Sequence, residues 1–270
     1  MFKDKVVIIT GASSGIGKAC AEEFASKGAH VVLAARGYDE LRYIAKNLEQ
    51  QYSIRALAVQ CDVSKEEDCK KLIKDTITTF NKIDILVNNA GISMRALFKD
   101  LDLSVLKTLM DVNFWGTVYC CKYAMPSILA SKGVIVGVSS IAGYRGLPGR
   151  TGYSASKFAM NGFLESLRVE NLKTGVHVMV ACPGFTASNI RNTALDTSGN
   201  QHGETSMDEN KMMTSMEVAK HIVKGITSRK RTLILTSQGK MAVLLNKLIP
   251  SWLDIQVYKL FSREKNPLIK

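Results

Sequence analysis

The stretch Thr10-Gly11-Ala12-Ser13-Ser14-Gly15-Ile16-Gly17 decides the fold of this 270-residue chain. It follows the β-branched run Val6-Val7-Ile8-Ile9 and precedes a helical pattern of apolar residues that stops at Gly28. Glycines allow a tight turn and a close approach of the backbone to a phosphate, and the first turn of a helix offers free N–H groups to it. A strand, a glycine-rich turn and a helix in this order predict a dinucleotide-binding βαβ unit, although the spacing is G-x-x-x-G-x-G and not the commoner G-x-G-x-x-G.

Short apolar runs and helical patterns alternate along the rest of the chain. Six further strands are predicted at residues 30–34, 54–59, 83–87, 134–138, 176–181 and 232–235, and helices at residues 39–51, 65–80, 103–129, 153–173 and 215–228. Uniformly apolar strands in strict alternation with helices are typical of a parallel sheet covered on both faces. We therefore expect one doubly wound α/β domain with a seven-stranded parallel sheet over residues 1–238, and a ligand at the carboxyl ends of its strands.

Two segments interrupt this alternation. Residues 189–214 are polar and follow the sixth strand, where ligands bind, so this insertion is either a lid over the site or an ordinary surface loop. Residues 239–270 form a C-terminal extension in which apolar residues recur at helical spacing, interrupted at Pro250. From residue 240 it carries six Lys/Arg and two Asp/Glu, which favours peripheral contact with an anionic membrane surface. Alternatively, these apolar residues pack on a second copy of the chain or over the substrate cleft.

Composition sets the class of protein. Hydrophobic residues make up 46% and charged residues 22% of the chain, which is typical of a globular protein and excludes disorder. The formal net charge of +12 suits several anionic partners, but without an aromatic–basic platform or a recognised module we expect no nucleic-acid binding. Six cysteines without C-x-x-C spacing and four histidines give no metal-binding pattern.

The first residues bear on the location of the protein. The chain enters its first strand at Val6, and no run approaches the roughly 20 apolar residues that a membrane-spanning helix needs. We therefore expect no signal peptide, reduced cysteine thiols, and a cytoplasmic protein that can lie peripherally at a membrane surface.

Three more motifs accompany the glycine-rich turn. Asn88-Asn89-Ala90-Gly91 follows the fourth predicted strand, Tyr153-Ser154-Ala155-Ser156-Lys157 begins a helix, and Pro183-Gly184 follows the sixth strand. In this order and spacing the four motifs, which cover roughly residues 5–235, resemble the short-chain dehydrogenase/reductase family. Within that family they are similar to NADP(H)-preferring reductases of lipid and steroid ketones. The resemblance implies a Rossmann fold, hydride transfer at a nicotinamide, and a homodimer or homotetramer.

The resemblance also implies a catalytic set of Asn113, Ser140, Tyr153 and Lys157. Tyr153 and Lys157 are four residues apart, so both project from one face of a helix, and a nearby ammonium would lower the pKa of the phenol. Such a phenol can exchange a proton with a ketone or alcohol oxygen, which Ser140 would hydrogen-bond. Ser139 is then structural, although either serine can point inward. Asn113 would hold a water that passes protons to Lys157, or would be a satisfied buried amide.

The end of the second predicted strand bears on the choice of cofactor. NAD-preferring members of the family carry an acid where this chain has Ala35, and Arg36 can present a planar cation to a 2′-phosphate. We therefore expect NADP(H), the alternative being that Arg36 is a solvated surface charge. Asp62 would accept a hydrogen bond from the adenine amino group. The cofactor-binding residues implied by the resemblance are Gly11, Ser13, Ser14, Gly15, Ile16, Gly17, Arg36, Asp62, Val63, Asn89, Ala90, Gly91, Tyr153, Lys157, Pro183, Gly184, Phe185 and Ser188.

The substrate is the least defined feature. Met94, Tyr144, Leu147 and Phe185 are candidates for an apolar wall beside Ser140, or for ordinary packing. Together with the amphipathic extension they favour a lipophilic ketone. The nearest analogies in the family act on 3-keto-sphingoid bases, acyl-dihydroxyacetone phosphates or steroids. Because cells keep NADP reduced, we expect reduction.

Two other functions would use the same motifs. A 3-oxoacyl-thioester reductase of fatty-acid synthesis would keep the same catalytic residues, but it would not need the C-terminal extension. A non-catalytic NADP(H)-binding scaffold would not need the complete catalytic set. We therefore favour NADPH-dependent reduction of a lipophilic ketone in lipid metabolism.

Overall fold

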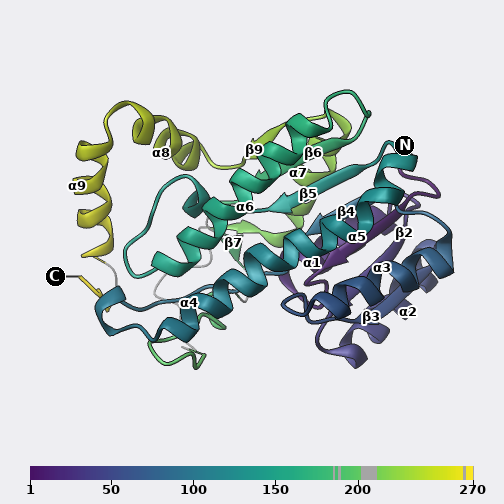
Figure 1. The fold of residues 1–270 in the computed structure, drawn as a ribbon, viewed down its shortest axis with the longest axis horizontal. Helices are drawn as coiled ribbons and strands as arrows, with labels where there is room; N and C mark the ends of the chain where they lie inside the picture. Colours follow the sequence, from purple (N-terminus) through teal and green to yellow (C-terminus); the bar gives the residue numbers. More distant parts are fainter. Residues whose placement is uncertain (185, 188–189, 202–211, 264–265, 270) are drawn as a thin grey trace.

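A parallel β-sheet lies at the centre of the molecule (Figure 1). The computed structural model describes residues 1–184, 186–187, 190–201, 212–263 and 266–269. Within them, seven parallel strands form the main sheet in the order β3-β2-β1-β4-β5-β6-β9, which confirms the predicted seven-stranded parallel sheet. The strands are β1 (Val6–Thr10), β2 (His30–Ala35), β3 (Ala56–Gln60), β4 (Ile85–Asn88), β5 (Val134–Val138), β6 (His177–Cys182) and β9 (Thr232–Ile234).

Helices cover both faces of the sheet, as predicted. Successive residues of a strand point to opposite faces, so Val7 and Ile9 of β1 pack with α1, α2 and α7, whereas Val6 and Ile8 pack with α3, α5 and α6. Both sides of each central strand are therefore buried, which is why the strands read as continuous apolar runs. The helices are α1 (Gly15–Ala25), α2 (Tyr38–Tyr52), α3 (Glu66–Phe80), α4 (Leu103–Met110), α5 (Gly116–Ser131), α6 (Thr151–Glu170) and α7 (Ser215–Thr227).

The strand order reverses between β1 and β4. The chain runs from β1 outward to β2 and β3, then returns to the other side of β1 with β4. Ile9 of β1 lies opposite Val87 of β4, so the two strands end side by side. The glycine-rich turn after β1 is thereby brought next to the Asn-Asn-Ala-Gly motif after β4. Ligands of doubly wound sheets bind at this kind of reversal, at the carboxyl ends of the strands.

The long helix predicted over residues 103–129 is interrupted in the structure. A π-helical turn, Asp111–Trp115, separates α4 from α5. Its central residue, Asn113, is fully buried, and its side chain hydrogen-bonds both the N–H and the C=O of Ile92. The wider turn lets this side chain reach the neighbouring loop without breaking the apolar packing on either side. Such π-bulges occur frequently at functional sites.

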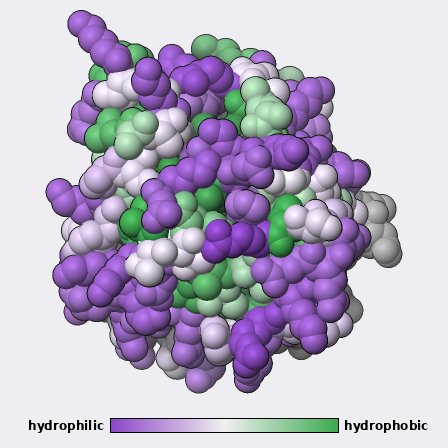
Figure 2. All heavy atoms as spheres, turned by 90° about the vertical axis from the view of Figure 1, so that its right-hand side faces the viewer, coloured by the Kyte–Doolittle hydropathy of each residue, from purple (hydrophilic) through white to green (hydrophobic). Residues whose placement is uncertain are grey.

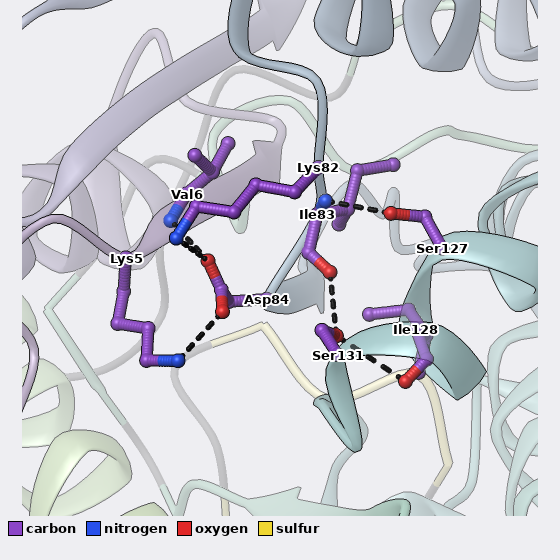
Figure 3. Close-up of polar contacts among 8 residues, drawn as sticks. All are labelled: Lys5, Val6, Lys82, Ile83, Asp84, Ser127, Ile128 and Ser131. Carbon is purple, nitrogen blue, oxygen red and sulfur yellow. Dashed lines mark hydrogen bonds and ion pairs between the residues drawn. The ribbon is translucent and has the colours of Figure 1, made fainter.

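Asp84 links the amino ends of β1 and β4 (Figure 3). It therefore lies at the opposite ends of these strands from the glycine-rich turn. Its buried carboxylate accepts hydrogen bonds from Lys5 Nζ at 2.7 Å and from the Val6 backbone N–H at 2.9 Å, and it lies 3.0 Å from Lys82 Nζ. Burial alone would raise the pKa of this carboxyl, but these three contacts outweigh it and lower the pKa below its ordinary value.

The C-terminal extension forms two helices, α8 (Ser237–Leu248) and α9 (Pro250–Phe261), at the end of the molecule farthest from α2 and α3 (Figure 1). Pro250 occupies the first turn of α9, where its missing N–H costs nothing. Arg145, in the loop after β5, donates to Asn246 Oδ1 at 3.0 Å and forms an ion pair with Asp254. The predicted helical extension is thus confirmed, and it is attached to a loop at the carboxyl edge of the sheet.

The surface differs between the two ends of the molecule. Hydrophilic residues predominate on the face at the α2–α3 end, where apolar residues form only small patches (Figure 2). The extension instead exposes large apolar side chains, namely Met241, Leu244, Leu248, Ile249, Trp252, Ile255, Tyr258 and Leu260. Within the described residues, no helix combines the length and the apolar character needed to cross a membrane.

The insertion predicted at residues 189–214 is described only in part, since residues 189 and 202–211 lie outside the described residues. Leu195 pairs with the loop after β4: its N–H donates to Ser93 O at 2.9 Å, and its C=O accepts from Arg95 N at 2.8 Å. A short parallel pair, β7 (Thr186–Ala187) and β8 (Met213–Thr214), joins the segment after β6 to the start of α7. This pair was not predicted, because two residues are too few for a periodic pattern.

Candidate active site

The glycine-rich turn is shaped by contacts that leave no room for side chains. Gly11 has a φ of +65°, and a Cβ there would lie 2.9 Å from the Cα of Ala90. A Cβ at Gly17 would lie 2.2 Å from the carbonyl oxygen of Gly11. The turn therefore folds tightly onto the first turn of α1. Ser14, the residue before that helix, does not cap it with its side chain. Ser14, Gly15 and Ile16 line a cavity at this end of the helix.

Asn89 fastens this turn to the motif after β4. Its Nδ2 donates to Thr10 O at 2.9 Å and to Gly11 O at 3.2 Å. In return, the Thr10 hydroxyl accepts hydrogen bonds from the backbone N–H groups of Asn89 and Ala90, each at 3.0 Å. The threonine of the first motif and the asparagine of the second thus form one reciprocal network. Through these bonds Asn89 positions the glycine-rich turn.

The four motifs line one cavity over the carboxyl ends of the strands. A neighbouring cavity shares Gly11, Ala90 and Gly91 and continues past Ser13, Arg36, Asp62 and Val63. Gly17 is buried beneath the turn, and Phe185 and Ser188 lie outside the described residues. The described residues that line the first cavity are Gly11, Ser14, Gly15, Ile16, Asn89, Ala90, Gly91, Ser93, Val138, Ser139, Ser140, Leu147, Arg150, Tyr153, Lys157, Pro183, Gly184, Thr186, Ile190, Arg191 and Thr193.

The second cavity suits the adenosine half of a dinucleotide. Arg36 is exposed at its rim, directly after β2, and its backbone C=O accepts from Gln60 Nε2 at 3.0 Å. Asp62 Oδ1 accepts from the backbone and the hydroxyl of Ser64 at 3.1 and 2.7 Å, which holds the carboxylate at the wall. A cation at the rim, a carboxylate within and a glycine cradle between the two cavities fit a dinucleotide lying across the crevice.

Ser140, Tyr153 and Lys157 lie together at the other end of the crevice. The Ser140 side chain hydrogen-bonds the phenol of Tyr153, and its Oγ also accepts from the backbone of Ala142 at 3.1 Å. Lys157 is 2% exposed, and its Nζ donates to the Val138 carbonyl at 2.9 Å and lies 5.9 Å from the centre of the Tyr153 ring. The structure therefore brings the predicted serine, tyrosine and lysine into one site.

The pKa values in this group depart from the expectation drawn from the sequence. Burial raises the pKa of Tyr153 above its ordinary value, and the Ser140 hydrogen bond and the positive charge of Arg150 offset this only in part. Burial also lowers the pKa of Lys157 to about 8. The expectation that the lysine lowers the phenol pKa is wrong for this structure. The ammonium is directed at a backbone carbonyl, and desolvation acts on both groups.

Asn113 joins the site from the π-helical turn. Its Oδ1 accepts from Ile92 N at 2.8 Å, and its Nδ2 donates to Ile92 O and to Ser156 Oγ, each at 2.9 Å. A Cβ on Gly91 would lie 3.1 Å from Asn113 Oδ1 and 3.4 Å from Lys157 Nζ. Glycine therefore lets both side chains lie close to the backbone at this position. The side chain of Asn113 is thus a satisfied buried amide that holds the loop after β4.

The expected apolar wall is only partly present around the cavity. Leu147 lines it, whereas Met94 is fully buried in a small core with Val105 and Leu109. The phenol of Tyr144 is half-buried and hydrogen-bonds Thr232 of β9 instead. Sequence reasoning missed two arginines among the lining residues, Arg150 and Arg191. A signal was available for Arg150, which lies three residues before Tyr153.

Comparison with known proteins agrees with this arrangement. A family model described as short chain dehydrogenase matches residues 5–199, and the chain belongs to the short-chain dehydrogenase/reductase family. It is an oxidoreductase of that family with the Rossmann-like NAD(P)-binding fold.

Its relatives include two proteins of Arabidopsis thaliana. One is 11-beta-hydroxysteroid dehydrogenase 1A, 36% identical over 263 residues, which cover 93% of this chain and 73% of the relative. The other is 11-beta-hydroxysteroid dehydrogenase-like 4A, 37% identical over 250 residues, which cover 92% of this chain and 82% of the relative. The chain is thus similar to steroid-type dehydrogenases over nearly its whole length.

Solved structures share the fold. A short-chain dehydrogenase from Sphingobium yanoikuyae in complex with NADPH has a TM-score of 0.77 at 25% identity, covering 93% of this chain and 96% of that one. A short-chain dehydrogenase/reductase from Burkholderia phymatum in complex with NAD has a TM-score of 0.82 at 23% identity, covering 98% and 97%. The second resemblance concerns the fold alone. Similar structures therefore hold either nicotinamide cofactor.

Proposed function

We propose that this protein reduces a ketone to a secondary alcohol with NADPH, with Tyr153 as the general acid. The observation that carries the proposal is that Ser140, Tyr153 and Lys157 line one cavity together with the glycine-rich turn. When bound, the reduced nicotinamide supplies a hydride to the carbonyl carbon. The carbonyl oxygen takes a proton, so that one ketone, one reduced cofactor and one proton give one alcohol and one oxidised cofactor.

Tyr153 provides that proton. A tyrosine phenol is protonated at neutral pH even at its ordinary pKa of about 10. Burial raises the pKa of Tyr153 further, so the phenol is in the form that a reduction requires. Ser140, which already bonds the phenol, donates a hydrogen bond to the substrate oxygen as negative charge develops on it. These two hydroxyls together fix the position of the carbonyl.

Lys157 restores the proton of Tyr153 and holds the nicotinamide ribose. A lysine with a pKa of about 8 exchanges protons readily near neutral pH, which supports this role. Asn113 positions the Gly91–Ile92 backbone beside it through the bonds described above. The relay water that the family resemblance implies beside Asn113 stays a prediction.

NADP(H) is the cofactor we propose. The exposed Arg36 and the Ser13 side of the second cavity support it, since a guanidinium and a hydroxyl suit a 2′-phosphate. Ala35 leaves no carboxylate at the end of β2 to bond both ribose hydroxyls, as NAD-preferring enzymes do. Asp62 and Val63 would enclose the adenine.

A lipophilic ketone of lipid metabolism is the substrate class we propose. Its support is the apolar extension, which is attached through Arg145 to the loop after β5, and the likeness to relatives named as hydroxysteroid dehydrogenases. A 3-keto-sphingoid base, an acyl-dihydroxyacetone phosphate and a steroid ketone are the three candidates. A 3-oxoacyl thioester is the alternative substrate.

The extension from residue 239 onward is proposed as a part separate from the catalytic domain, residues 1–238. It would contact a membrane surface peripherally, in a cytoplasmic protein. Exposed Trp252 and Tyr258 suit the headgroup level, and Lys240, Lys247 and Lys259 lie on the same two helices. Flotation with anionic and with neutral vesicles tests this. Binding to the anionic vesicles that is lost in Trp252→Glu would support it, and no binding to either would overturn it.

A homodimer or homotetramer is also proposed, through α5 and α6. Their outer faces expose large apolar side chains, including Leu129, Phe158 and Val169. Light scattering with Phe158→Glu tests this surface. A mass that falls to that of one chain in the variant would support it, and a monomeric wild type would overturn it.

The first experiment measures the loss of reduced-nicotinamide absorbance by the purified protein. NADPH and NADH are offered separately with each candidate ketone and with a 3-oxoacyl thioester. Turnover of a lipid ketone with NADPH that Tyr153→Phe lowers by at least a hundredfold would support the proposal. Preference for the thioester would keep the chemistry and overturn the substrate class. Cofactor binding without turnover of any compound would favour a non-catalytic scaffold.

A further inference from the structure

The described part of the insertion contributes a wall to the second cavity, which Arg36 and Asp62 also line. Residues 195–201 form a closed hairpin, which we call the insertion hairpin, because Leu195 and Gln201 pair in antiparallel fashion. Its cavity-lining residues are Leu195, Ser198, Gly199 and Gln201. A segment far along the chain thus borders the cavity that suits the adenosine half of a dinucleotide.

Three contacts fix the insertion hairpin against the rest of the domain. Leu195 exchanges backbone hydrogen bonds with the loop after β4. The C=O of Thr197 accepts a hydrogen bond from the N–H of Asp102, directly before α4, at 2.9 Å. Gly199 lies against α4, since a Cβ there would be 3.5 Å from Val105 Cγ2. The hairpin is therefore attached to the same two elements that form the far side of the second cavity.

Asp196 organises the hairpin from within. Its Oδ1 accepts hydrogen bonds from the backbone N–H groups of Ser198 and Asn200, each at 2.9 Å, and these bonds hold the pKa of the carboxyl below its ordinary value. Its own N–H donates to the C=O of Asn200 at 2.8 Å. Gly199, in the turn, has a φ of +90°, which residues with a side chain rarely adopt. Asp196 itself lines neither cavity, so it acts on a ligand only through the hairpin.

We propose that the insertion hairpin is part of the cofactor site and that Asp196 is a positioning residue for the adenosine half of the cofactor. The inference rests on the proposed placement of that half beside Arg36, and it does not depend on which substrate is reduced. A folded hairpin forms its wall before the cofactor binds. If the hairpin is folded only part of the time, the apparent Kd rises by the inverse of the folded fraction, so a fraction of about one tenth costs about tenfold in affinity.

The charge of Asp196 predicts an effect of the opposite sign. The cofactor carries phosphates, so a carboxylate that acted only by repulsion would weaken cofactor binding, and its removal would tighten that binding. Loss of the hairpin would weaken it instead. Asp196→Ala removes both the charge and the hydrogen-bond acceptor, whereas Asp196→Asn removes the charge and keeps an oxygen that can accept from both N–H groups. The two variants therefore separate the position of the hairpin from the charge.

Calorimetry measures the Kd of NADPH and of adenosine 2′,5′-bisphosphate, which is the adenosine half without the nicotinamide. Wild type is compared with Asp196→Ala, Asp196→Asn and Gly199→Ala, which places a side chain at the positive φ without changing the charge. Asp100→Ala, which alters an exposed aspartate shortly before α4, is the matched control. Arg36→Ala reports whether the adenosine half lies where it is proposed. Thermal unfolding of each variant checks that the domain is folded.

Asp196→Ala is expected to raise the Kd of both ligands about tenfold or more, and Gly199→Ala should raise it as well. Asp196→Asn should stay within about threefold of wild type, and Asp100→Ala within about twofold. Unchanged or tighter binding in Asp196→Ala would overturn the inference, and so would a loss confined to NADPH. An unchanged Kd of adenosine 2′,5′-bisphosphate in Arg36→Ala would overturn the proposed placement of the cofactor. If the variants behave as expected but no ketone is turned over, only the proposed reduction is overturned.

Discussion

Lys157 Nζ donates a hydrogen bond to the carbonyl oxygen of Val138, the last residue of β5, at 2.9 Å. The bond joins the catalytic helix α6 to the end of β5, directly before Ser139 and Ser140. It also holds an ammonium in an almost fully buried position, which is why the pKa of this lysine falls to about 8. The site therefore contains a cation whose burial opposes folding.

The contribution of Lys157 to stability should accordingly rise with pH above neutrality. The pKa of Lys157 is lower in the folded than in the unfolded chain, so the unfolded chain binds more protons between about pH 8 and pH 10.5. From about pH 7 to pH 9 the wild type should gain on the order of 1 kcal/mol of unfolding free energy relative to Lys157→Met, which lacks this titration. Urea unfolding at both pH values measures it. Parallel pH profiles of the two proteins would contradict the assigned shift.

Arg36→Ala should separate the two nicotinamide cofactors. Losing a charge-assisted contact to the 2′-phosphate should raise the KM for NADPH about tenfold or more and leave the KM for NADH within about twofold. Steady-state kinetics with both cofactors checks this, with Arg42→Ala as the control on the neighbouring helix. An equal effect on both cofactors would mean that Arg36 is a solvated surface charge.

Asp84→Asn should destabilise the fold by about 2 kcal/mol without changing kcat, because it weakens a buried hydrogen-bonded charge network far from the crevice. The folded pKa of Asp84 is lowered, so its contribution is present above the unfolded pKa and is lost as pH falls through the folded value. The difference in unfolding free energy between wild type and variant should therefore be full at about pH 7 and shrink as the pH is lowered below about 4, which urea unfolding at a series of pH values measures. The exposed pair of Lys71 with Asp75 provides the control, since Asp75→Asn should cost at most about 0.5 kcal/mol.

Asn113→Ala should lower stability by about 2–4 kcal/mol and activity at the same time. It leaves the N–H and C=O of Ile92 without their partner and removes the hydrogen bond that the Ser156 hydroxyl accepts. Urea unfolding and kcat/KM are the measurements, with the exposed Asn47→Ala of α2 as control. A fully stable Asn113→Ala would show that these bonds contribute little to the fold.

Much of the fold could be predicted from local pattern. The alternation of apolar runs and helices indicates a parallel sheet covered on both faces. All five residues of β1 are buried, so the sequence of this strand is apolar throughout. The grouping of Gly11, Asn89 and Tyr153 at one edge also follows, because parallel strands bring their carboxyl ends together. Such features depend on neighbours along the chain and on topology rules.

Other features depend on contacts between distant segments, and the sequence could not predict them. The π-helical turn at Asn113 accompanies the hydrogen bonds of its amide with Ile92. The spacing of apolar residues on either side of Asn113 does not indicate it. Met94 reads as a candidate wall residue, yet it packs against α4 and Gly152. The raised pKa of Tyr153 likewise reflects the burial of the phenol by segments that are distant in the sequence.

The loop after β5 contacts both the extension, α8 and α9, and the catalytic cavity. Binding of a surface by the extension and binding of substrate in the cavity therefore involve the same loop. Arg145 contacts Asn246 and Asp254 on the extension, while Arg150, five residues later, lines the catalytic cavity and meets Phe261. Free energy is a state function, so any factor by which capture of the extension by a surface changes substrate affinity must equal the factor by which substrate changes that capture. If that capture raises substrate affinity, substrate would concentrate the protein at the surface; if it lowers substrate affinity, the surface would release bound substrate.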